Sequence, residues 1–220
     1  VVAKDDATHQ GLAAQFADHS IERSYLAMVW GQPLSRTGII EGQIGRSPRN
    51  RKKMAVLRHG GKFARTHYRV LDSIDDLISL VECRLETGRT HQIRVHMTSI
   101  GHSIVGDPVY GGVRKLSAMT SQVICDQLVN VTSTVLHAKV LGFVHPITKK
   151  QLLFHSRKHS RYLNLFNNIL LHKRLLSKVL QYQAFYLSLF LLQILTFFLL
   201  FRLKEFFFAH HTHMDQQRRI

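Results

Sequence analysis

Short, largely hydrophobic runs bounded by turn residues between residues 20 and 155 predict a set of strands. The strands are expected at residues 23–30, 66–71, 77–85, 135–144 and 150–154. An acidic turn joins the second strand to the third. The last two flank His145-Pro146-Ile147-Thr148, a sequence typical of a hairpin turn.

Two helices are expected among these strands. The pair Asp5-Asp6 precedes apolar residues at helical spacing, and acidic residues suit the first turn of a helix. A second helix is predicted over Thr90–Ile100, because Ile93 and Met97 share one helical face. Antiparallel strands with a few interposed helices indicate an α+β fold, with a mixed, largely antiparallel sheet and flanking helices.

The chain changes character in its last third. No Gly or Pro follows Pro146, whereas nine of the thirteen Phe residues lie after residue 160. Since globular domains punctuate their elements with Gly and Pro, we expect one domain over residues 1–158 and a tail over 159–220. Within the tail, residues 179–201 carry no charge and are long enough for a membrane-spanning helix. The composition also fits a non-native extension, read past a frameshift or a lost stop codon, or a buried or partner-binding helix.

The formal charge of +16 indicates a polyanionic partner, either a nucleic acid or an anionic membrane. Both parts of the chain contribute to the positive charge. Residues 1–160 hold 22 Lys and Arg and 12 Asp and Glu, and residues 161–220 hold 8 Lys and Arg and 2 Asp and Glu. Cys83 and Cys125 match no metal-binding or redox spacing and are interpreted as reduced thiols of a cytoplasmic protein. No signal peptide is evident at the start of the sequence.

One segment concentrates this charge. Between Arg46 and Arg69 there are nine Lys or Arg residues and no acid. Gly and Pro residues interrupt the segment, so loops or short strands are expected here rather than a basic helix. Such cation density is what phosphate binding requires, and we predict RNA contact by Arg49, Arg51, Lys52 and Lys53. A solvated loop without a ligand is the alternative.

The segment 85–111 carries the most specific pattern in the chain. It contains Thr87-Gly88-Arg89-Thr90-His91-Gln92-Ile93-Arg94-Val95-His96 and, further on, Gly106-Asp107-Pro108-Val109-Tyr110-Gly111. A helix over the first run would place Arg94 at the edge of the core, where a charged side chain needs a carboxylate or a phosphate. No acid lies on the same helix, so a distant partner is expected. Asp107, before Pro108, is interpreted as a turn residue.

Both runs resemble the closing motifs of the pseudouridine synthases that act on large-subunit ribosomal RNA. Residues 15–27, which end in Arg23-Ser24-Tyr25-Leu26-Ala27, resemble a helix and strand of that family. The resemblance extends over residues 1–155. It implies the pseudouridine synthase catalytic fold, a ribosomal RNA partner, no metal or organic cofactor, and a monomer.

The resemblance also implies site residues. In that family an Asp attacks the uridine, an Arg pairs with this Asp, and a Tyr stacks on the base and serves in proton transfer. Carried over by position, Arg94 is the Arg and Tyr25 is the Tyr. Arg89, His91 and Gln92 are expected to contact RNA beside the basic segment.

The family's nucleophile lies in a His-Arg-Leu-Asp motif, which is absent from residues 1–220. We therefore expect this chain to represent a synthase fold without its catalytic Asp and to be inactive by itself. Two alternatives stay open: a catalytically dead remnant that still binds RNA, and a small basic membrane protein.

Overall fold

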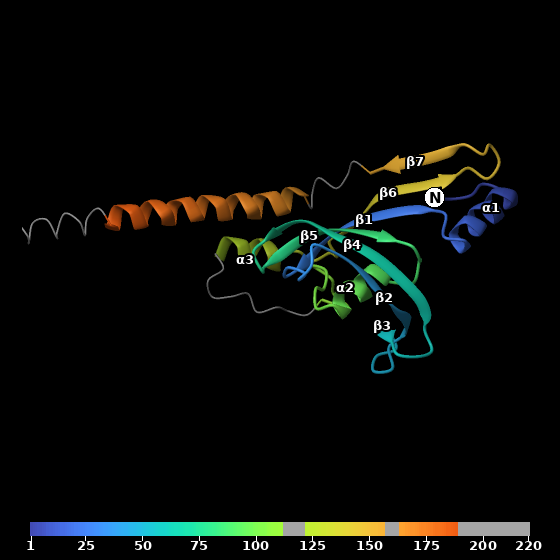
Figure 1. The fold of residues 1–220 in the computed structure, drawn as a ribbon, viewed down its shortest axis with the longest axis horizontal. Helices are drawn as coiled ribbons and strands as arrows, with labels where there is room; N and C mark the ends of the chain where they lie inside the picture. The colour runs from blue at the N-terminus through green and yellow to red at the C-terminus, as the bar shows by residue number, and fades with distance from the viewer. Residues whose placement is uncertain (112–121, 157–162, 189–220) are drawn as a thin grey trace, which may run out of the picture. The chain divides into compact units, whose positions relative to one another are not determined.

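The computed structural model describes residues 1–111, 122–156 and 163–188. Seven antiparallel strands form one curved sheet with the order β3-β2-β4-β5-β1-β6-β7 (Figure 1). The strands are β1 (Glu22–Trp30), β2 (Thr37–Arg46), β3 (Met54–Leu57), β4 (Lys62–Ile74), β5 (Ile78–Leu85), β6 (Leu136–Val144) and β7 (Gln151–His155). The helices are α1 (Asp6–Ala17), α2 (Gln92–Ser99), α3 (Gln122–Val129) and a helix over residues 163–188. The expected α+β class is confirmed.

The interior strand β1 forms the centre of the core. It pairs with β5 on one side and with β6 on the other, and its apolar residues Ala27, Met28 and Val29 are buried. A strand covered on both faces reads as a continuous apolar run rather than an alternating one, as Leu26–Trp30 does. Burial of these side chains is the main favourable contribution that holds β1 in the sheet.

Helix α1 begins where the acidic pair predicted it. The Asp5 carboxylate caps the helix by accepting the Thr8 N–H at 2.8 Å. The Gln15 side chain then ties the helix to β6, because its Nε2 donates to the Val144 carbonyl at 2.7 Å and its Oε1 accepts the Val144 N–H at 2.9 Å. Leu12 packs with Ile21 and Phe143 beneath it.

Helix α2 lies against one face of the sheet, near β2, β3 and β4 (Figure 1). Its buried residues include Ile93 and Met97, the pair from which the helix was predicted. Two polar side chains of α2 also reach the sheet, since Gln92 and His96 both hydrogen-bond the Thr66 hydroxyl at 2.9 Å. These contacts fix the rotation of the helix, and hence the direction in which Arg94 points.

The chain divides into two compact units at Leu170, which differs from the boundary expected near residue 158. The first unit extends further because Phe166 and Ile169, at the start of the helix over 163–188, are buried in the core beside β1 and β5. In the part of the chain that the structure describes, no helix is long and apolar enough to cross a membrane. Most of the uncharged stretch 179–201 lies outside the described residues.

Candidate active site

Arg94 is held by Asp107 through two hydrogen bonds. Its Nε lies 2.7 Å from Oδ2 and its Nη2 lies 2.8 Å from Oδ1. The Asp107 side chain is 0 % exposed, whereas the Arg94 side chain is 17 % exposed. The pair therefore joins α2 to the turn that follows it, and it fixes the guanidinium in one orientation at the edge of the core.

The electrostatics of this pair keep both groups charged. Burial by itself raises the pKa of Asp107, but hydrogen bonds from Arg94 and from the N–H groups of Tyr110 and Val109 outweigh it, so the pKa is lowered. The hydrogen bond to Asp107 in turn raises the pKa of Arg94. A buried carboxylate with this many donors is stabilised as the anion.

Asp107 is thus both the turn residue expected from the sequence and the distant partner of Arg94. A bend after α2 returns Asp107 to the helix and places its carboxylate against Arg94. The contacts with Asp107 engage Nε and Nη2, and Nη1 has no hydrogen-bond partner among the described residues. One edge of the guanidinium is therefore available to a second anion or a carbonyl.

Tyr25 lies on the same face of the sheet as α2. Residues that face each other across antiparallel strands point to the same side, and Tyr25 stands opposite Cys83, which stands opposite Tyr68. Tyr68 is two residues from Thr66, the residue that hydrogen-bonds α2. Tyr25 is half-buried, and in the described residues no hydrogen bond links it to Arg94. The two predicted catalytic side chains thus share a face of the sheet.

Arg23 adds a buried cation next to Tyr25 on β1. The residue is 8 % exposed, and its Nη2 lies 3.4 Å from the Glu86 carbonyl oxygen. Its Nε is buried and has no hydrogen-bond partner among the described residues. Burial lowers the pKa of Arg23. Gly88 leaves room for the guanidinium, since a Cβ at that position would lie 2.5 Å from Nη1. The glycine of the motif is therefore explained by the approach of Arg23.

The structure corrects the role expected for Gln92. Gln92 is only 2 % exposed, and its side chain hydrogen-bonds within the protein. Nε2 donates to the Arg65 carbonyl at 2.9 Å, and Oε1 accepts from the Thr87 hydroxyl at 2.8 Å and from the Arg89 N–H at 2.9 Å. Gln92 locks the turn in front of α2 to β4 and is a structural residue.

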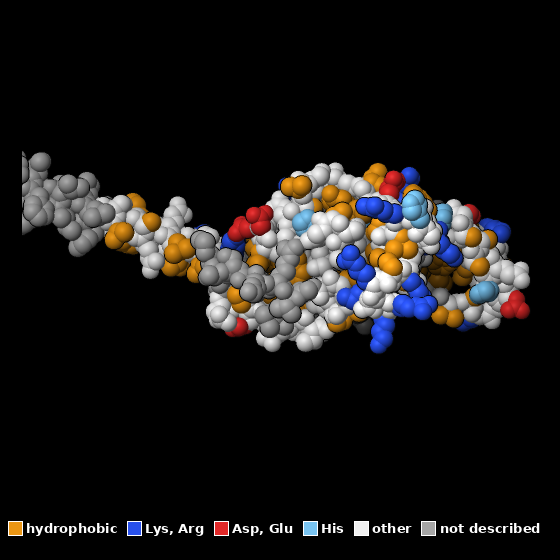
Figure 2. Space-filling model, turned by 90° about the horizontal axis from the view of Figure 1, so that it is seen from below, with side chains coloured by type: hydrophobic (Ala, Val, Ile, Leu, Met, Phe, Trp, Pro, Cys, Tyr) orange, Lys and Arg blue, Asp and Glu red, His pale blue; other side chains and the backbone are white. Residues whose placement is uncertain are grey.

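The predicted RNA contacts Arg49, Arg51, Lys52 and Lys53 lie in the basic loop, residues 47–53, between β2 and β3. Arg49, Arg51 and Lys52 are exposed, and Lys53 is half-buried. The loop has its own hydrogen bonds, among them Ser47 N–H to the Lys53 carbonyl and Lys53 N–H to the Asn50 carbonyl, both 2.9 Å. Figure 2 shows Lys and Arg side chains gathered on the face seen from below, where β3 lies. The loop is thus a preformed cationic projection.

Arg89 borders a hollow of about 610 Å³ next to this loop. Its Nε donates to the Phe63 carbonyl at 2.9 Å, which orients the side chain along the rim. The lining consists of Ile44, Gly45, Met54, Gly60, Gly61, Lys62, Gly88, Arg89 and Thr90. Two cations beside a glycine-rich wall suit a phosphodiester backbone, to which Arg and Lys donate and which glycines let approach closely.

His91, the remaining predicted contact, is exposed and precedes α2 in a left-handed backbone conformation, with φ of 58°. Its Nδ1 lies 2.9 Å from the Tyr110 hydroxyl. Burial, followed by the charge of Arg94, lowers the pKa of His91. Left-handed residues other than glycine are uncommon and often mark functional turns.

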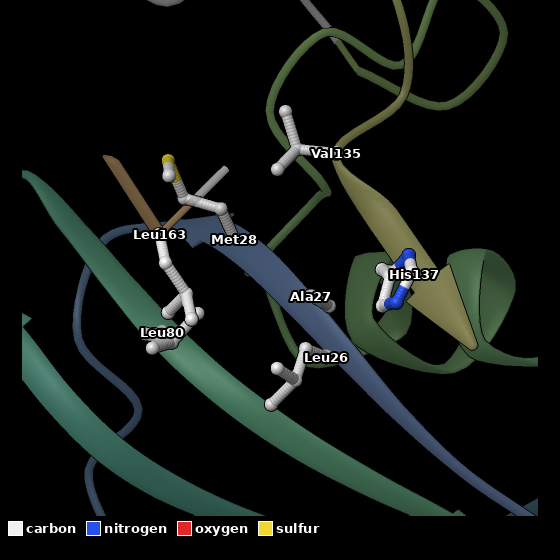
Figure 3. Close-up of a pocket in the computed structure, with 7 residues that line it drawn as sticks. All are labelled: Leu26, Ala27, Met28, Leu80, Val135, His137 and Leu163. Carbon is white, nitrogen blue, oxygen red and sulfur yellow. The ribbon is translucent and has the colours of Figure 1, made fainter. Parts of the chain in front are cut away.

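A second pocket, between β1, β5 and β6, offers no comparable chemistry. Its volume is about 10 Å³, room for roughly one water molecule. Figure 3 shows its aliphatic lining, including Leu26, Leu80 and Leu163, with His137 on the neighbouring strand. Within the described residues, no group of three or more His, Cys, Asp or Glu side chains is placed to hold a metal ion.

Comparison with known proteins identifies similar sequences. Residues 1–99 match the family described as RNA pseudouridylate synthase. The chain is 49 % identical over 175 residues to ribosomal large subunit pseudouridine synthase D of Zymomonas mobilis, covering 79 % of this chain and 53 % of that protein. It is 45 % identical over 156 residues to the protein of the same name from Nitrosomonas europaea, covering 71 % of this chain and 43 % of that protein. The chain therefore spans about half the length of these curated relatives.

Solved structures resemble the fold. The human RNA pseudouridylate synthase domain containing 1 protein matches with a TM-score of 0.58 and 25 % identity, over 71 % of this chain and 62 % of that one. The human RNA pseudouridylate synthase domain containing 4 protein matches with a TM-score of 0.56 and 22 % identity, over 74 % of this chain and 69 % of that one.

Proposed function

The chain belongs to the RNA pseudouridylate synthase family, and we propose that it supplies the Arg- and Tyr-bearing part of an enzyme that isomerises uridine to pseudouridine in large-subunit ribosomal RNA. The relatives named as large-subunit enzymes support this choice of RNA. The proposal includes action as a monomer in the cytoplasm, where ribosomal RNA is the partner of the basic loop.

The observation that carries the proposal is the state of Arg94. Asp107 holds the guanidinium charged and oriented through Nε and Nη2, while Nη1, at the edge of the core, has no hydrogen-bond partner in the part of the chain that the structure describes. An Arg fixed in this way can pair with a second carboxylate and keep it ionised as a nucleophile. In the proposed enzyme that carboxylate belongs to the Asp of the His-Arg-Leu-Asp motif.

Tyr25 has a separate task in the proposed reaction. The isomerisation breaks the bond between N1 of uracil and the sugar and forms a bond from C5, so that C5 loses a hydrogen and N1 gains one. No atom enters or leaves overall, and no oxidant or reductant is required. Tyr25 presents a half-buried ring on the α2 face of the sheet, where a base turned out of its stack can lie against it. Its hydroxyl then serves in the proton transfer at C5.

The test begins with chain 1–220 and unmodified large-subunit ribosomal RNA, with pseudouridine detected by chemical labelling and primer extension. This chain has no Arg-Leu-Asp segment, so no product is expected. A second protein carries a segment with the family motif ahead of Val1, and it is expected to form pseudouridine. Formation of pseudouridine by chain 1–220 itself would show that the nucleophile was assigned to the wrong residue.

Two variants of the fused protein separate the roles of the two side chains. Arg94→Ala should abolish product and also lower stability, because it leaves the Asp107 carboxylate buried without its partner. Tyr25→Phe keeps the ring, so it should retain RNA binding and stability and lose turnover alone. Full turnover in Arg94→Ala, with folding and RNA binding intact, would exclude Arg94 as the partner of the nucleophile. A fused protein that binds RNA without turnover would instead support the binding-remnant alternative.

A further inference from the structure

Tyr110 contacts both the end of the basic loop and the residue that precedes α2. Its hydroxyl oxygen accepts the N–H of Met54, the first residue of β3 after the loop, at 2.9 Å. The same oxygen lies 2.9 Å from Nδ1 of His91. Since the oxygen already accepts from Met54, its own hydrogen can be donated to a neutral His91.

The ring and backbone of Tyr110 also contact the ion pair. The guanidinium carbon of Arg94 lies 4.8 Å from the centroid of the Tyr110 ring, the geometry of a cation–π contact. The ring meets that of His91 edge to face, with centroids 5.6 Å apart and planes at 78°. The Tyr110 N–H donates to Oδ1 of Asp107 at 3.0 Å. The Tyr110 side chain thus touches Met54, His91 and Arg94, and its backbone N–H binds Asp107.

The basic loop can transmit a displacement because it is internally bonded. Besides the two backbone hydrogen bonds between Ser47, Asn50 and Lys53, Nη1 of Arg46 donates to the Arg51 carbonyl at 3.0 Å. A loop braced in this way moves as one piece. Its far end is Met54, whose N–H is held by Tyr110. A displacement of the loop can therefore reach Tyr110 through Met54, which also pairs with Arg46 of β2.

We propose that Tyr110 is a positioning residue that couples RNA engagement of the basic loop to the orientation of Arg94. The inference rests on the proposed function, in which the loop binds ribosomal RNA and Arg94 pairs with the nucleophile. In the full enzyme, docking of phosphates on residues 47–53 fixes Met54, and the Tyr110 ring then holds the guanidinium in place. Asp107 orients the guanidinium without RNA, and RNA on the loop adds a constraint that Tyr110 transmits to it.

The first experiment compares hydrogen exchange in chain 1–220 and in Tyr110→Phe, without RNA. The variant keeps the ring and loses the hydroxyl, so exchange at the Met54 N–H should accelerate about tenfold or more, while the amides of β5 stay unchanged. Tyr68→Phe is the matched control, because the Tyr68 hydroxyl has no hydrogen-bond partner among the described residues. Unchanged exchange at Met54, or equal acceleration throughout β5, would overturn the proposal.

The second experiment measures the coupling itself. The Nε–H resonance of Arg94 is followed by NMR while a fragment of unmodified large-subunit ribosomal RNA is added. The resonance should shift on binding in chain 1–220 and in Tyr68→Phe, and the shift should fall by at least half in Tyr110→Phe at saturating RNA. An equal shift in all three proteins would overturn the coupling. Failure of chain 1–220 to bind the RNA would overturn the proposed function, and the exchange measurement would still decide separately whether Tyr110 anchors Met54.

Discussion

Nε and Nη2 of Arg94 bind the two carboxylate oxygens of Asp107 at 2.7 and 2.8 Å, across thirteen residues of sequence. The carboxylate is fully buried and also accepts the N–H groups of Val109 and Tyr110. The turn after α2 and the guanidinium on α2 therefore depend on the same anion. Loss of that charge affects the fold and the site together.

The first prediction concerns that anion. Asp107→Asn preserves the shape of the side chain but leaves the half-buried Arg94 without a counter-charge, so the free energy of unfolding should fall by about 3 kcal/mol in urea denaturation. Asp76→Asn, at an exposed acid, should change it by less than about 0.5 kcal/mol. The double variant Asp107→Asn with Arg94→Met should lose less than the two single variants added together. Strict additivity would indicate that the ion pair contributes nothing specific.

Stability should also depend on pH through His96. This residue is fully buried, and burial lowers its pKa from 6.5 to about 4. The folded pKa lies below the unfolded one. The neutral ring therefore makes its full contribution to the free energy of unfolding above pH 6.5, and this contribution is lost as the pH falls toward 4. The shift corresponds to a loss of about 3 kcal/mol across that window.

His96→Gln supplies the control, because it fills a similar volume and does not titrate. Its free energy of unfolding should vary less between pH 7 and pH 4, measured by urea denaturation at several pH values. Asp107 and Glu82 have lowered pKa values, so their protonation destabilises the protein only at lower pH, below their unfolded pKa values of 3.8 and 4.5. The same pH dependence in both proteins would mean that His96 is not the titrating group.

If the basic loop binds phosphates, the affinity for RNA should depend on salt through the charges of this loop. Replacing Arg51 and Lys52 with Ala should weaken binding to large-subunit ribosomal RNA and reduce the slope of log K against log salt by about 0.7 to 0.9 per lost phosphate contact. Lys149→Ala with Lys150→Ala removes two exposed charges from the β6–β7 hairpin and should leave the slope unchanged. Equal effects of the two double variants would show that only the total charge matters.

Gln92 should behave as a structural residue. Gln92→Ala removes the acceptor of the Thr87 hydroxyl and the Arg89 N–H and the donor to the Arg65 carbonyl. The buried groups left unpaired should lower the free energy of unfolding by about 2 to 3 kcal/mol. The salt slope of RNA binding, measured where the variant is folded, should not change. A reduced slope with normal stability would restore Gln92 as an RNA contact.

Local pattern was sufficient for most of the secondary structure. The Asp5 cap, the apolar run of β1 and the Ile93–Met97 face of α2 each depend on neighbours close in sequence, and each appears where it was predicted. The strand β2 was not predicted, and β3 fell in a segment where only loops or short strands were expected, because Gly residues and charges interrupt the hydrophobic pattern. The pairing of β2 with β4, and of β3 with β2, supplies the hydrogen bonds that the pattern could not indicate.

The sequence by itself determined which motif the chain carries, and therefore which Arg and Tyr to consider. Only the tertiary structure decided what those residues touch. Asp107 could not be assigned to Arg94, nor Tyr110 to Met54, because each contact joins residues brought together by a turn or by sheet pairing. Gln92 was misassigned for the same reason: a polar side chain in a basic motif suggests a ligand contact, but burial against β4 satisfies its donors and acceptors internally. Periodicity reports the face of an element, whereas the partner on that face depends on packing between distant segments.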